Sequence, residues 1–493
     1  MDRRTFLKAA GAGALLARAG TAWAQTRSNL LPVLPLNDLT DGFDERIQLN
    51  LNAASHDFGS GAASKSFGIN SNYLGQVLRV KQGQTLPFDV VNGIGEVTTI
   101  HWHGLHIPGE VDGGPHQEIE PGHTWAPDVP IRQQAAMTWF HSHMHGRTAE
   151  QVYKGLAGVM LVEDDASLSA DLPQTYGVDD FTIVLQDKKF DDEGKTSYFL
   201  TGETFEEGFL GDTFVVNGTI APTGQNVPDG LVRLRILNAC NARFLTLRMA
   251  YGPLTVIASD GGFLASAVET ENLIVSPGER YEVLVDMSTL ETNSLTAASF
   301  PGYGRLFRLL AQFINEQIPE TTVLTLSRTG EKGFTGSMPR RLANLPPAHA
   351  DEATVTREIT LNMGESDELA TLAANWGNFC GEGMGMGING QPMKMDRIDQ
   401  RARLGETELW RISAEEEIHP FHVHGCSFRI LRQESHDTVS YAQGWKDMVH
   451  VQNGEAEILV RFDHEAPDHA PYMYHCHILE HEDCGMMGQF TVS

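Results

Sequence analysis

Cysteine is scarce in this sequence, with five residues among 493. The five stand at positions 240, 380, 426, 476 and 484, an odd number that includes no CxxC pair. A disulfide framework is therefore excluded as the basis of the fold, and at least one cysteine must have another role. An oxidising compartment would allow one disulfide among Cys240, Cys380, Cys426 and Cys484, but the spacing does not pair them.

Basic residues are also few relative to acidic ones, with 36 Lys and Arg against 64 Asp and Glu and a net charge of −28. Such a chain repels a phosphate backbone, so nucleic acid is excluded as a partner. An acidic surface attracts cationic substrates such as metal ions, although the same charge also serves simply to keep a protein soluble. We expect a small-molecule partner and a monomeric protein.

Long apolar runs are missing, so no stretch is predicted to span a membrane and no membrane partner is expected. The N-terminus carries an Arg-Arg pair at residues 3–4, followed by a weakly apolar run rich in Ala and Gly. This pattern resembles a twin-arginine export signal, and Ala-Trp-Ala at residues 22–24 supplies the small residues that a signal peptidase needs. We predict a signal peptide over residues 1–24 and a periplasmic protein. The alternative, an N-terminal helix of the fold, is disfavoured by Pro32 and Pro35.

Long helical periodicity is hard to find, and residues 366–376 are the best local candidate for a helix. Short runs of Val, Ile, Leu, Phe and Thr recur instead, separated by Gly, Pro, Asn and Asp. This spacing is typical of strands in sandwiches or barrels, and it predicts an all-β fold.

An internal repeat indicates the number of domains. Residues 83–92, 230–238 and 405–413 each read as a turn followed by an alternating strand. Three copies suggest three similar domains, which agrees with the length of the chain. We expect the signal peptide at 1–24, domains at 40–166, 167–328 and 356–493, and a linker at 329–355.

The pattern His-X-His occurs four times. Because successive side chains of a strand point to opposite faces, both imidazoles of one unit project the same way, about 6.5 to 7 Å apart. One such pair arises easily by chance, but these four take eight of the chain's 20 His residues. They predict a metal cluster built from His101/His103, His141/His143, His422/His424 and His475/His477.

The segment 475–477 places Cys476 between two His. Alternation puts its thiolate on the opposite side of the strand from both imidazoles, so a metal on Cys476 would lie back to back with the His cluster. His481 and Met486 follow, and His419 opens the run ahead of the third His pair. Two His, one thiolate and a weak thioether are the ligands of a blue-copper electron-transfer site. An inert thiol and a core-filling Met are the alternative interpretations.

Residues 101–115, 419–425 and 475–487 together resemble the multicopper oxidase family. The likeness is closest to its bacterial copper-efflux (cuprous) oxidase and bacterial laccase branch, while the middle third matches mainly in strand and turn rhythm. The resemblance implies three cupredoxin-like Greek-key β-barrel or sandwich domains, the second acting as a spacer or substrate wall. It also implies four copper ions: one type 1, one type 2 and two type 3.

The family pattern assigns every ligand position. It makes His419, Cys476, His481 and Met486 the type 1 ligands, and it makes His101 and His422 the type 2 ligands. One type 3 copper takes His103, His141 and His477, and the other takes His143, His424 and His475.

The resemblance implies that the type 1 copper takes single electrons from a small reducing substrate and passes them through Cys476, so that four transfers reduce one O₂ to two waters. Glu482 is then the candidate proton relay and Asp112 the candidate carboxylate near the type 2 copper. Either one read alone could be a solvated surface acid. Asp447 is a candidate for supporting a ligand His.

Three kinds of electron donor are compatible with the sequence: Cu(I), another metal ion, and a phenol or aromatic amine. The Met-rich insert of copper-efflux relatives is missing, and what remains is Met384, Met386, Met393 and Met395, which suit Cu(I) or simply fill the core. The carboxylates of Glu415, Glu416 and Glu417 suit the binding of a harder cation, or they would accept the proton of a phenol. We predict an oxidase that acts in periplasmic copper tolerance. The alternatives are a laccase-like phenol oxidase with no part in copper homeostasis and a non-catalytic, cupredoxin-like structural protein of the envelope, which would be expected to have lost ligands.

Overall fold

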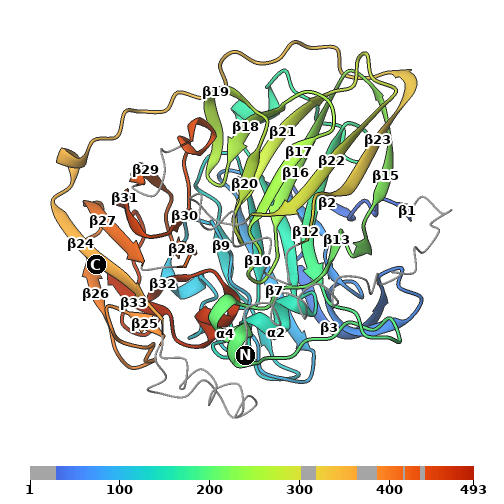
Figure 1. The fold of residues 1–493 in the computed structure, drawn as a ribbon. Coiled ribbons are helices and arrows are strands. Elements are labelled where there is room, and N and C mark those ends of the chain that lie inside the picture. The colour runs from blue at the N-terminus through green and yellow to red at the C-terminus, as the bar shows by residue number, and fades with distance from the viewer. Residues whose placement is uncertain (1–28, 301–317, 364–385, 415–416, 434–438) are drawn as a thin grey trace, which may run out of the picture.

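The computed structural model describes residues 29–300, 318–363, 386–414, 417–433 and 439–493 (Figure 1). The expected signal peptide, the candidate helix at 366–376 and the residues Cys380, Met384, Glu415 and Glu416 lie outside these ranges. The expectation of an all-β fold is confirmed, because three successive pairs of β-sheets make up most of the molecule.

The first pair of sheets takes its strands from the N-terminal part of the chain. One sheet has the order β10-β11-β6-β2, and the other has the order β5-β4-β3-β7-β8 with β9 also paired to β7. The strands are β2 (Leu36–Asp38), β3 (Ile47–Asp57), β4 (Ala63–Ile69), β5 (Leu74–Gly75), β6 (Val77–Lys81), β7 (Thr85–Gly93), β8 (Thr124–Trp125), β9 (Asp128–Pro130), β10 (Ala136–His141) and β11 (Ala157–Glu163).

The second pair of sheets uses the middle of the chain together with the short N-terminal strand β1. Its sheets have the orders β14-β13-β12-β16-β21-β18-β19 and β1-β15-β23-β22-β17-β20. The strands are β1 (Asn29–Leu30), β12 (Asp180–Lys188), β13 (Thr213–Val216), β14 (Thr219–Ile220), β15 (Thr223–Asp229), β16 (Leu231–Asn238), β17 (Leu245–Met249), β18 (Leu254–Ser259), β19 (Gly262–Thr270), β20 (Leu273–Val275), β21 (Arg280–Asp286), β22 (Thr292–Ser299) and β23 (Thr321–Lys332).

The third pair of sheets has the orders β25-β24-β27-β31-β29 and β26-β33-β32-β28-β30. The strands are β24 (Val355–Asn362), β25 (Gly387–Ile388), β26 (Gln400–Ala402), β27 (Thr407–Ala414), β28 (His419–Val423), β29 (Phe428–Gln433), β30 (Met448–Val451), β31 (Gly454–Arg461), β32 (Tyr472–Cys476) and β33 (Met487–Val492). An extended segment joins β23 to β24 across the top of the molecule in Figure 1.

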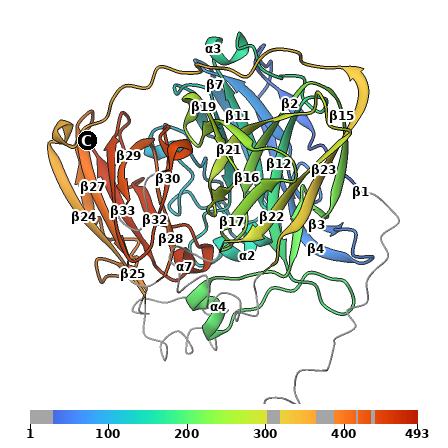
Figure 2. The same ribbon diagram turned by 45° about the horizontal axis from the view of Figure 1, so that its top comes forward.

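The described helices are short. The α-helices are α2 (Thr148–Tyr153), α3 (Asp165–Leu168), α4 (Gly202–Glu207) and α7 (Leu479–Asp483), and the 3-10 helices are η1 (Gly109–Val111), η3 (Ala350–Glu352) and η4 (Ser440–Ala442). In the part of the chain that the structure describes, no helix has the length and apolar character to cross a bilayer. Helix α7 contacts both α2 and α4, and Figure 2 shows it beside α2.

The three repeated segments form the same element in each pair of sheets. Strands β7, β16 and β27 each begin just after a glycine with positive φ, at Gly83, Gly230 and Gly405. Each strand also pairs in parallel with an earlier strand, in the pairs β3–β7, β12–β16 and β24–β27. Glycine adopts this φ without the steric cost that a Cβ brings, so the turn and the strand recur together.

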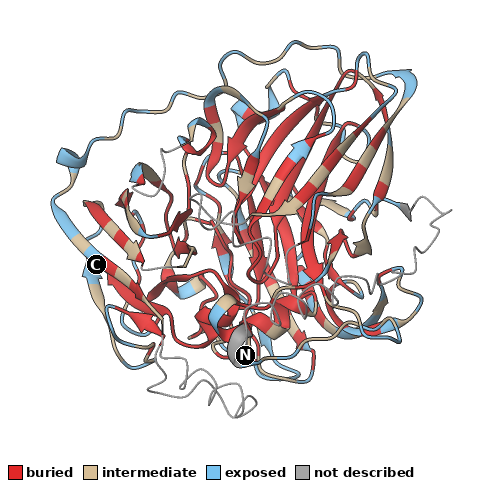
Figure 3. Cartoon of the chain, in the orientation of Figure 1, coloured by how far each residue is buried: buried red, intermediate tan, exposed pale blue. Residues whose placement is uncertain are grey.

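Each pair of sheets encloses its own apolar core, which Figure 3 shows as runs of buried residues along the strands. Strand β7 alternates buried and partly exposed residues, whereas β16 is buried along its whole length. Full burial of β16 means that both of its faces are covered: Val232, Leu234 and Ile236 lie in the second core, and Leu237 lies in a cluster shared with the first pair of sheets. The third core includes Cys476 and Met486, so the expected thiolate site lies inside this core.

A buried lysine joins the first and second pairs of sheets. Nζ of Lys188, at the end of β12, donates to the backbone carbonyl of Tyr153 and lies 3.8 Å from the centre of its ring. Burial is the main cause that lowers the pKa of Lys188 to about 7. The neighbouring thiol of Cys240 and phenol of Tyr73 have pKa values raised by burial, so both stay neutral near pH 8.

This lysine predicts a pH dependence of stability. Its folded pKa lies below that of an exposed lysine, about 10.4, so the unfolded chain binds more protons between these values and stability rises with pH there. We expect the metal-free protein to gain up to about 1.4 kcal/mol per pH unit relative to Lys188→Met in this window. Unfolding by urea at several pH values measures the difference. Equal pH slopes for the parent and Lys188→Met would contradict the prediction, and Lys65→Met, at an exposed site, is the control.

Candidate metal centres

The strands bring the four His pairs to one place between the first and third pairs of sheets. His101 forms a β-bridge with His141, the last residue of β10. In the third pair, β28 lies antiparallel to β32 with His422 opposite His475. Phe421 stands opposite Cys476 in the same ladder, so the thiol points to the other face of the strand pair, into the third core.

The thiol of Cys476 forms a compact group with two imidazoles. Its Sγ lies 3.5 Å from Nδ1 of His419 and 3.6 Å from Nδ1 of His481, which helix α7 carries. The backbone N–H of Cys476 donates to the carbonyl of Met486, a fully buried residue. The structure therefore gathers three of the predicted type 1 residues, His419, Cys476 and His481, around one buried point. The fourth, Met486, lies beside them in the backbone and in the same core.

Two triads of His form the larger centre. His103, His141 and His477 make one group, in which Nε2 of His141 lies 3.4 Å from Nδ1 of His103. In the other group, Nε2 of His475 lies 3.3 Å from Nε2 of both His143 and His424. His101 and His422 approach the same centre, with His424 close to both. All eight side chains are buried.

In six of the eight imidazoles of the cluster, a hydrogen bond from the outer ring nitrogen fixes the orientation of the ring. A His whose outer N–H is held in this way presents its other nitrogen to a metal. These six nitrogens lie 2.7–3.2 Å from their acceptors. Four acceptors are backbone carbonyls: that of Asp112 for His101, Asp447 for His422, Ser142 for His141 and Cys476 for His475. Two are carboxylates: that of Asp112 for His424 and that of Asp447 for His103. Of the other two imidazoles, His143 has Nδ1 beside the carboxylate of Glu482, and neither ring nitrogen of His477 has a hydrogen-bond partner.

The inner nitrogens fit copper. Nε2 of His101, His422 and His477 is buried and has no hydrogen-bond partner, a costly arrangement unless a cation takes the lone pairs. Burial is the largest cause that lowers the pKa of most of these rings, among them His103, His143 and His424, so they are neutral and able to ligate. Imidazoles with one thiol and one thioether nearby are a donor set suited to copper.

Both predicted catalytic carboxylates lie beside the cluster. Glu482 is fully buried, with its two carboxylate oxygens 3.2 Å from Nδ1 of His143 and 3.3 Å from Nδ1 of His475. Burial, aided by the nearby carboxyl of Asp483, raises the pKa of Glu482 well above its usual value. Asp112, also buried, holds His101 and His424 through its carbonyl and its carboxylate. Neither residue is a solvated surface acid.

The middle part of the chain contributes two contacts that the sequence did not predict, one from strand β21 and one from helix α4. Arg280 of β21 forms two hydrogen bonds of 2.6 Å with the carboxylate of Asp447. Nε2 of His481 bonds to the carbonyl of Glu206 in α4, over a distance of 3.0 Å. These residues carry no recognisable motif, and the ligand-free middle third gave no reason to look there.

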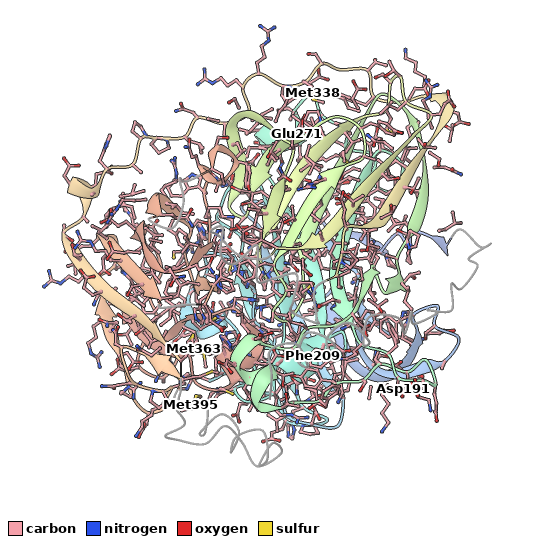
Figure 4. All side chains as sticks on the ribbon, viewed as in Figure 1. Asp191, Phe209, Glu271, Met338, Met363 and Met395 are labelled. Atoms are coloured by element: carbon pink, nitrogen blue, oxygen red, sulfur yellow. The ribbon has the colours of Figure 1, made fainter. Side chains whose placement is uncertain are left out.

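The methionines and cysteines outside the ligand sets lie in mixed settings. Met386 and Met393 are buried. Met395 is 37% exposed, and Figure 4 labels it at one end of the third pair of sheets. The same figure places Met338 at the far end of the molecule. Cys240 and Cys426 are buried free thiols.

A mononuclear Cys–His site back to back with eight converging imidazoles, on an all-β scaffold, defines a protein built to bind several copper ions. Family models described as multicopper oxidase match residues 51–167, 179–304 and 356–493. The chain belongs to the multicopper oxidase family, and this membership implies copper binding.

Solved structures of similar proteins include two bacterial oxidases. One is a laccase-like multicopper oxidase, CueO, from the lignin-degrading bacterium Ochrobactrum sp., at 39% identity and a TM-score of 0.84 over 94% of this chain and 100% of that one. The other is the multicopper oxidase McoA from Aquifex aeolicus, at 30% identity and a TM-score of 0.80 over 95% of this chain and 100% of that one.

Curated relatives carry a different name. Cell division protein FtsP of Escherichia coli (strain K12) is 36% identical over 500 residues, which cover 100% of this chain and 99% of that protein. FtsP of Salmonella typhimurium (strain LT2) is 37% identical over 499 residues, with the same coverage. Similarity over the whole chain therefore joins this protein both to oxidases and to proteins named for cell division.

Proposed function

We propose that this protein is a four-copper oxidase that couples four one-electron oxidations of a small reducing substrate to the reduction of O₂ to water. The observation that carries the proposal is the complete donor set, buried and with inner nitrogens such as Nε2 of His101, His422 and His477 left without partners. The ligand assignment proposed is the one that the sequence predicted, with type 1, type 2 and two type 3 positions. The three predicted domain ranges belong to the same proposal.

Bound copper would supply the one-electron steps and the chemistry of oxygen. The chain's own residues would connect and serve the centres. Cys476 is covalently continuous with His475 and His477, which gives electrons a path of a few bonds from one centre to the other. Glu482, held between His143 and His475, would keep a proton beside the place where oxygen is reduced. Asp112 would fix His101 and His424 in orientations suited to metal binding.

One absorption spectrum and one metal analysis test the proposal. After loading with copper, we expect about four copper ions per chain, an intense visible band from type 1 copper and a near-ultraviolet shoulder from the type 3 pair. A colourless protein that retains no copper would contradict it.

For the electron donor we propose Cu(I) or a phenol, and each choice has support. Met395 is an exposed thioether two residues after the buried Met393, and thioethers are soft ligands that suit Cu(I). The laccase-like CueO that resembles this chain is described as acting on lignin model compounds. Comparing turnover of Cu(I) and of 2,6-dimethoxyphenol, with and without added Cu(II), separates a cuprous oxidase from a laccase.

A second candidate is a role in the cell envelope during division, favoured by the name and the full-length similarity of the FtsP relatives. Such a role needs the fold and not the metal. Complementation of a gene deletion by a variant that cannot bind type 1 copper tests this candidate: a structural role predicts that the variant restores division as well as the parent does, and a failure to restore division would contradict it.

We also propose export by the twin-arginine route to the periplasm, on the evidence of the sequence pattern at residues 1–24. Mass spectrometry of the mature N-terminus tests the predicted cleavage after Ala24. A mature chain that begins at Met1 would contradict it.

A further inference from the structure

Arg280 is the first residue of β21 and is fully buried. Its two terminal nitrogens donate to the two carboxylate oxygens of Asp447, each over 2.6 Å. Its remaining donors bond to the backbone carbonyls of Met137, Gly278 and Asp260, at 3.0–3.2 Å. A bidentate pair with every other donor satisfied fixes the guanidinium in one position, so the carboxylate of Asp447 is fixed too.

Asp447 in turn contacts two predicted ligands. Its carboxylate lies 3.2 Å from Nε2 of His103, and its backbone carbonyl accepts from Nδ1 of His422 over 2.8 Å. His103 therefore presents Nδ1 to the group that it forms with His141 and His477. Asp447 directly precedes β30, which pairs with the ligand-bearing strand β28. The sheet therefore also fixes the backbone of Asp447, including the carbonyl that His422 contacts.

Two glycines show how closely the second pair of sheets approaches the cluster. A Cβ on Gly104, the residue after His103, would lie 2.6 Å from the Arg280 guanidinium and 2.7 Å from the Asp447 carboxylate. A Cβ on Gly278 would lie 3.1 Å from the ring of His477. The backbone of one type 3 ligand and the ring of another thus pack directly against this part of the chain, which contributes no ligand itself.

Ion pairs of Lys446, the residue next to Asp447, already hold the second and third pairs of sheets together. Lys446 bonds to Glu279 over 2.6 Å and to Asp260 over 2.8 Å, and so joins the second and third pairs of sheets. Arg280 adds a contact of another kind, because its partner Asp447 also touches His103 and His422.

We propose that Arg280 is a positioning residue for the copper cluster: through Asp447 it orients His103 and His422, so the middle part of the chain takes part in binding the type 2 and type 3 copper. This inference rests on the proposed function, since it concerns the same ligands. It extends the expected role of the middle domain from a spacer to a support of the cluster.

The test compares copper binding by the full-length parent, Arg280→Lys and the double variant Arg280→Met/Asp447→Leu. Lysine keeps the charge but cannot bridge both carboxylate oxygens. The double variant removes both charges, which avoids a buried unpaired carboxylate that would prevent folding. Arg243→Lys is the matched control, because Arg243 is also buried and paired with Asp187, away from the predicted ligands.

Copper content, the near-ultraviolet band and the type 2 electron paramagnetic resonance signal are measured beside the visible type 1 band. We expect both Arg280 variants to bind cluster copper about 10- to 100-fold more weakly in competition with a Cu(I) chelator, with the type 1 band retained. Unchanged cluster copper in both variants, in a parent that does bind copper, overturns the positioning role alone. A parent that binds no copper overturns the proposed function and this inference with it.

Discussion

The Cys476→Ser variant is expected to lose the type 1 copper and all substrate-driven oxygen consumption. Cys476 is the one thiol within reach of His419 and His481 among the described residues, and a serine hydroxyl is a hard, poor ligand for copper. Electrons from the substrate then have no entry. The eight imidazoles are untouched, so copper content should fall by about one ion per chain.

Metal analysis, the visible spectrum and oxygen uptake check this expectation. Burial raises the pKa of the Cys476 thiol, so the thiolate depends on a bound metal ion and the effect should appear only in copper-loaded protein. Cys240→Ser is the control, because Cys240 is a buried thiol of the second core and not of the third core that holds Cys476. Retention of the visible band or of turnover in Cys476→Ser would refute the type 1 assignment.

The Glu482→Gln variant is expected to bind a full set of copper but to turn over about 10²-fold or more slowly. The amide keeps the size of the side chain and cannot deliver a proton to the site between His143 and His475. Anaerobic reduction of the type 1 band should proceed at the parent rate, while reoxidation by O₂ should be slow. Stopped-flow spectroscopy separates the two half-reactions.

Glu480→Gln is the matched control for this prediction. Glu480 lies on the same helix and is as deeply buried, but one of its oxygens accepts hydrogen bonds from Tyr198 and Asn241, away from the cluster. A glutamine carbonyl can accept the same bonds. Equal slowing in both variants would mean that any change in α7 impairs the enzyme, and full turnover in Glu482→Gln would exclude the relay.

The sequence predicted the family, the all-β class and the residues that now meet at one place. The site could be predicted because side chains alternate along a strand: His475 and His477 lie on one face and Cys476 on the other in any fold that makes this segment a strand. The partners of the outer nitrogens were harder to foresee. Asp112 was predicted through the family resemblance, and Asp447 was named as a candidate for supporting a ligand His.

What the sequence could not supply were contacts between distant elements. Arg280 reaches Asp447 across 167 residues of chain, and Glu206 reaches His481 across 275. Neither residue stands in a motif, and their roles depend on how the second pair of sheets packs on the third. The electron donor stays a prediction for a similar reason, since a substrate surface is set by loops and not by ligand spacing.

The cluster is built from two segments that lie far apart in the sequence, and this determines when the protein can acquire metal. Asp112 and His424, which bond to each other there, are 312 residues apart along the chain, and the Arg280 support comes from between them. A chain truncated before His424 holds no complete cluster, so the cluster can acquire its metal only after both segments have been synthesised. Because bound metal stabilises only the form that binds it, copper would act as a checkpoint that favours intact molecules.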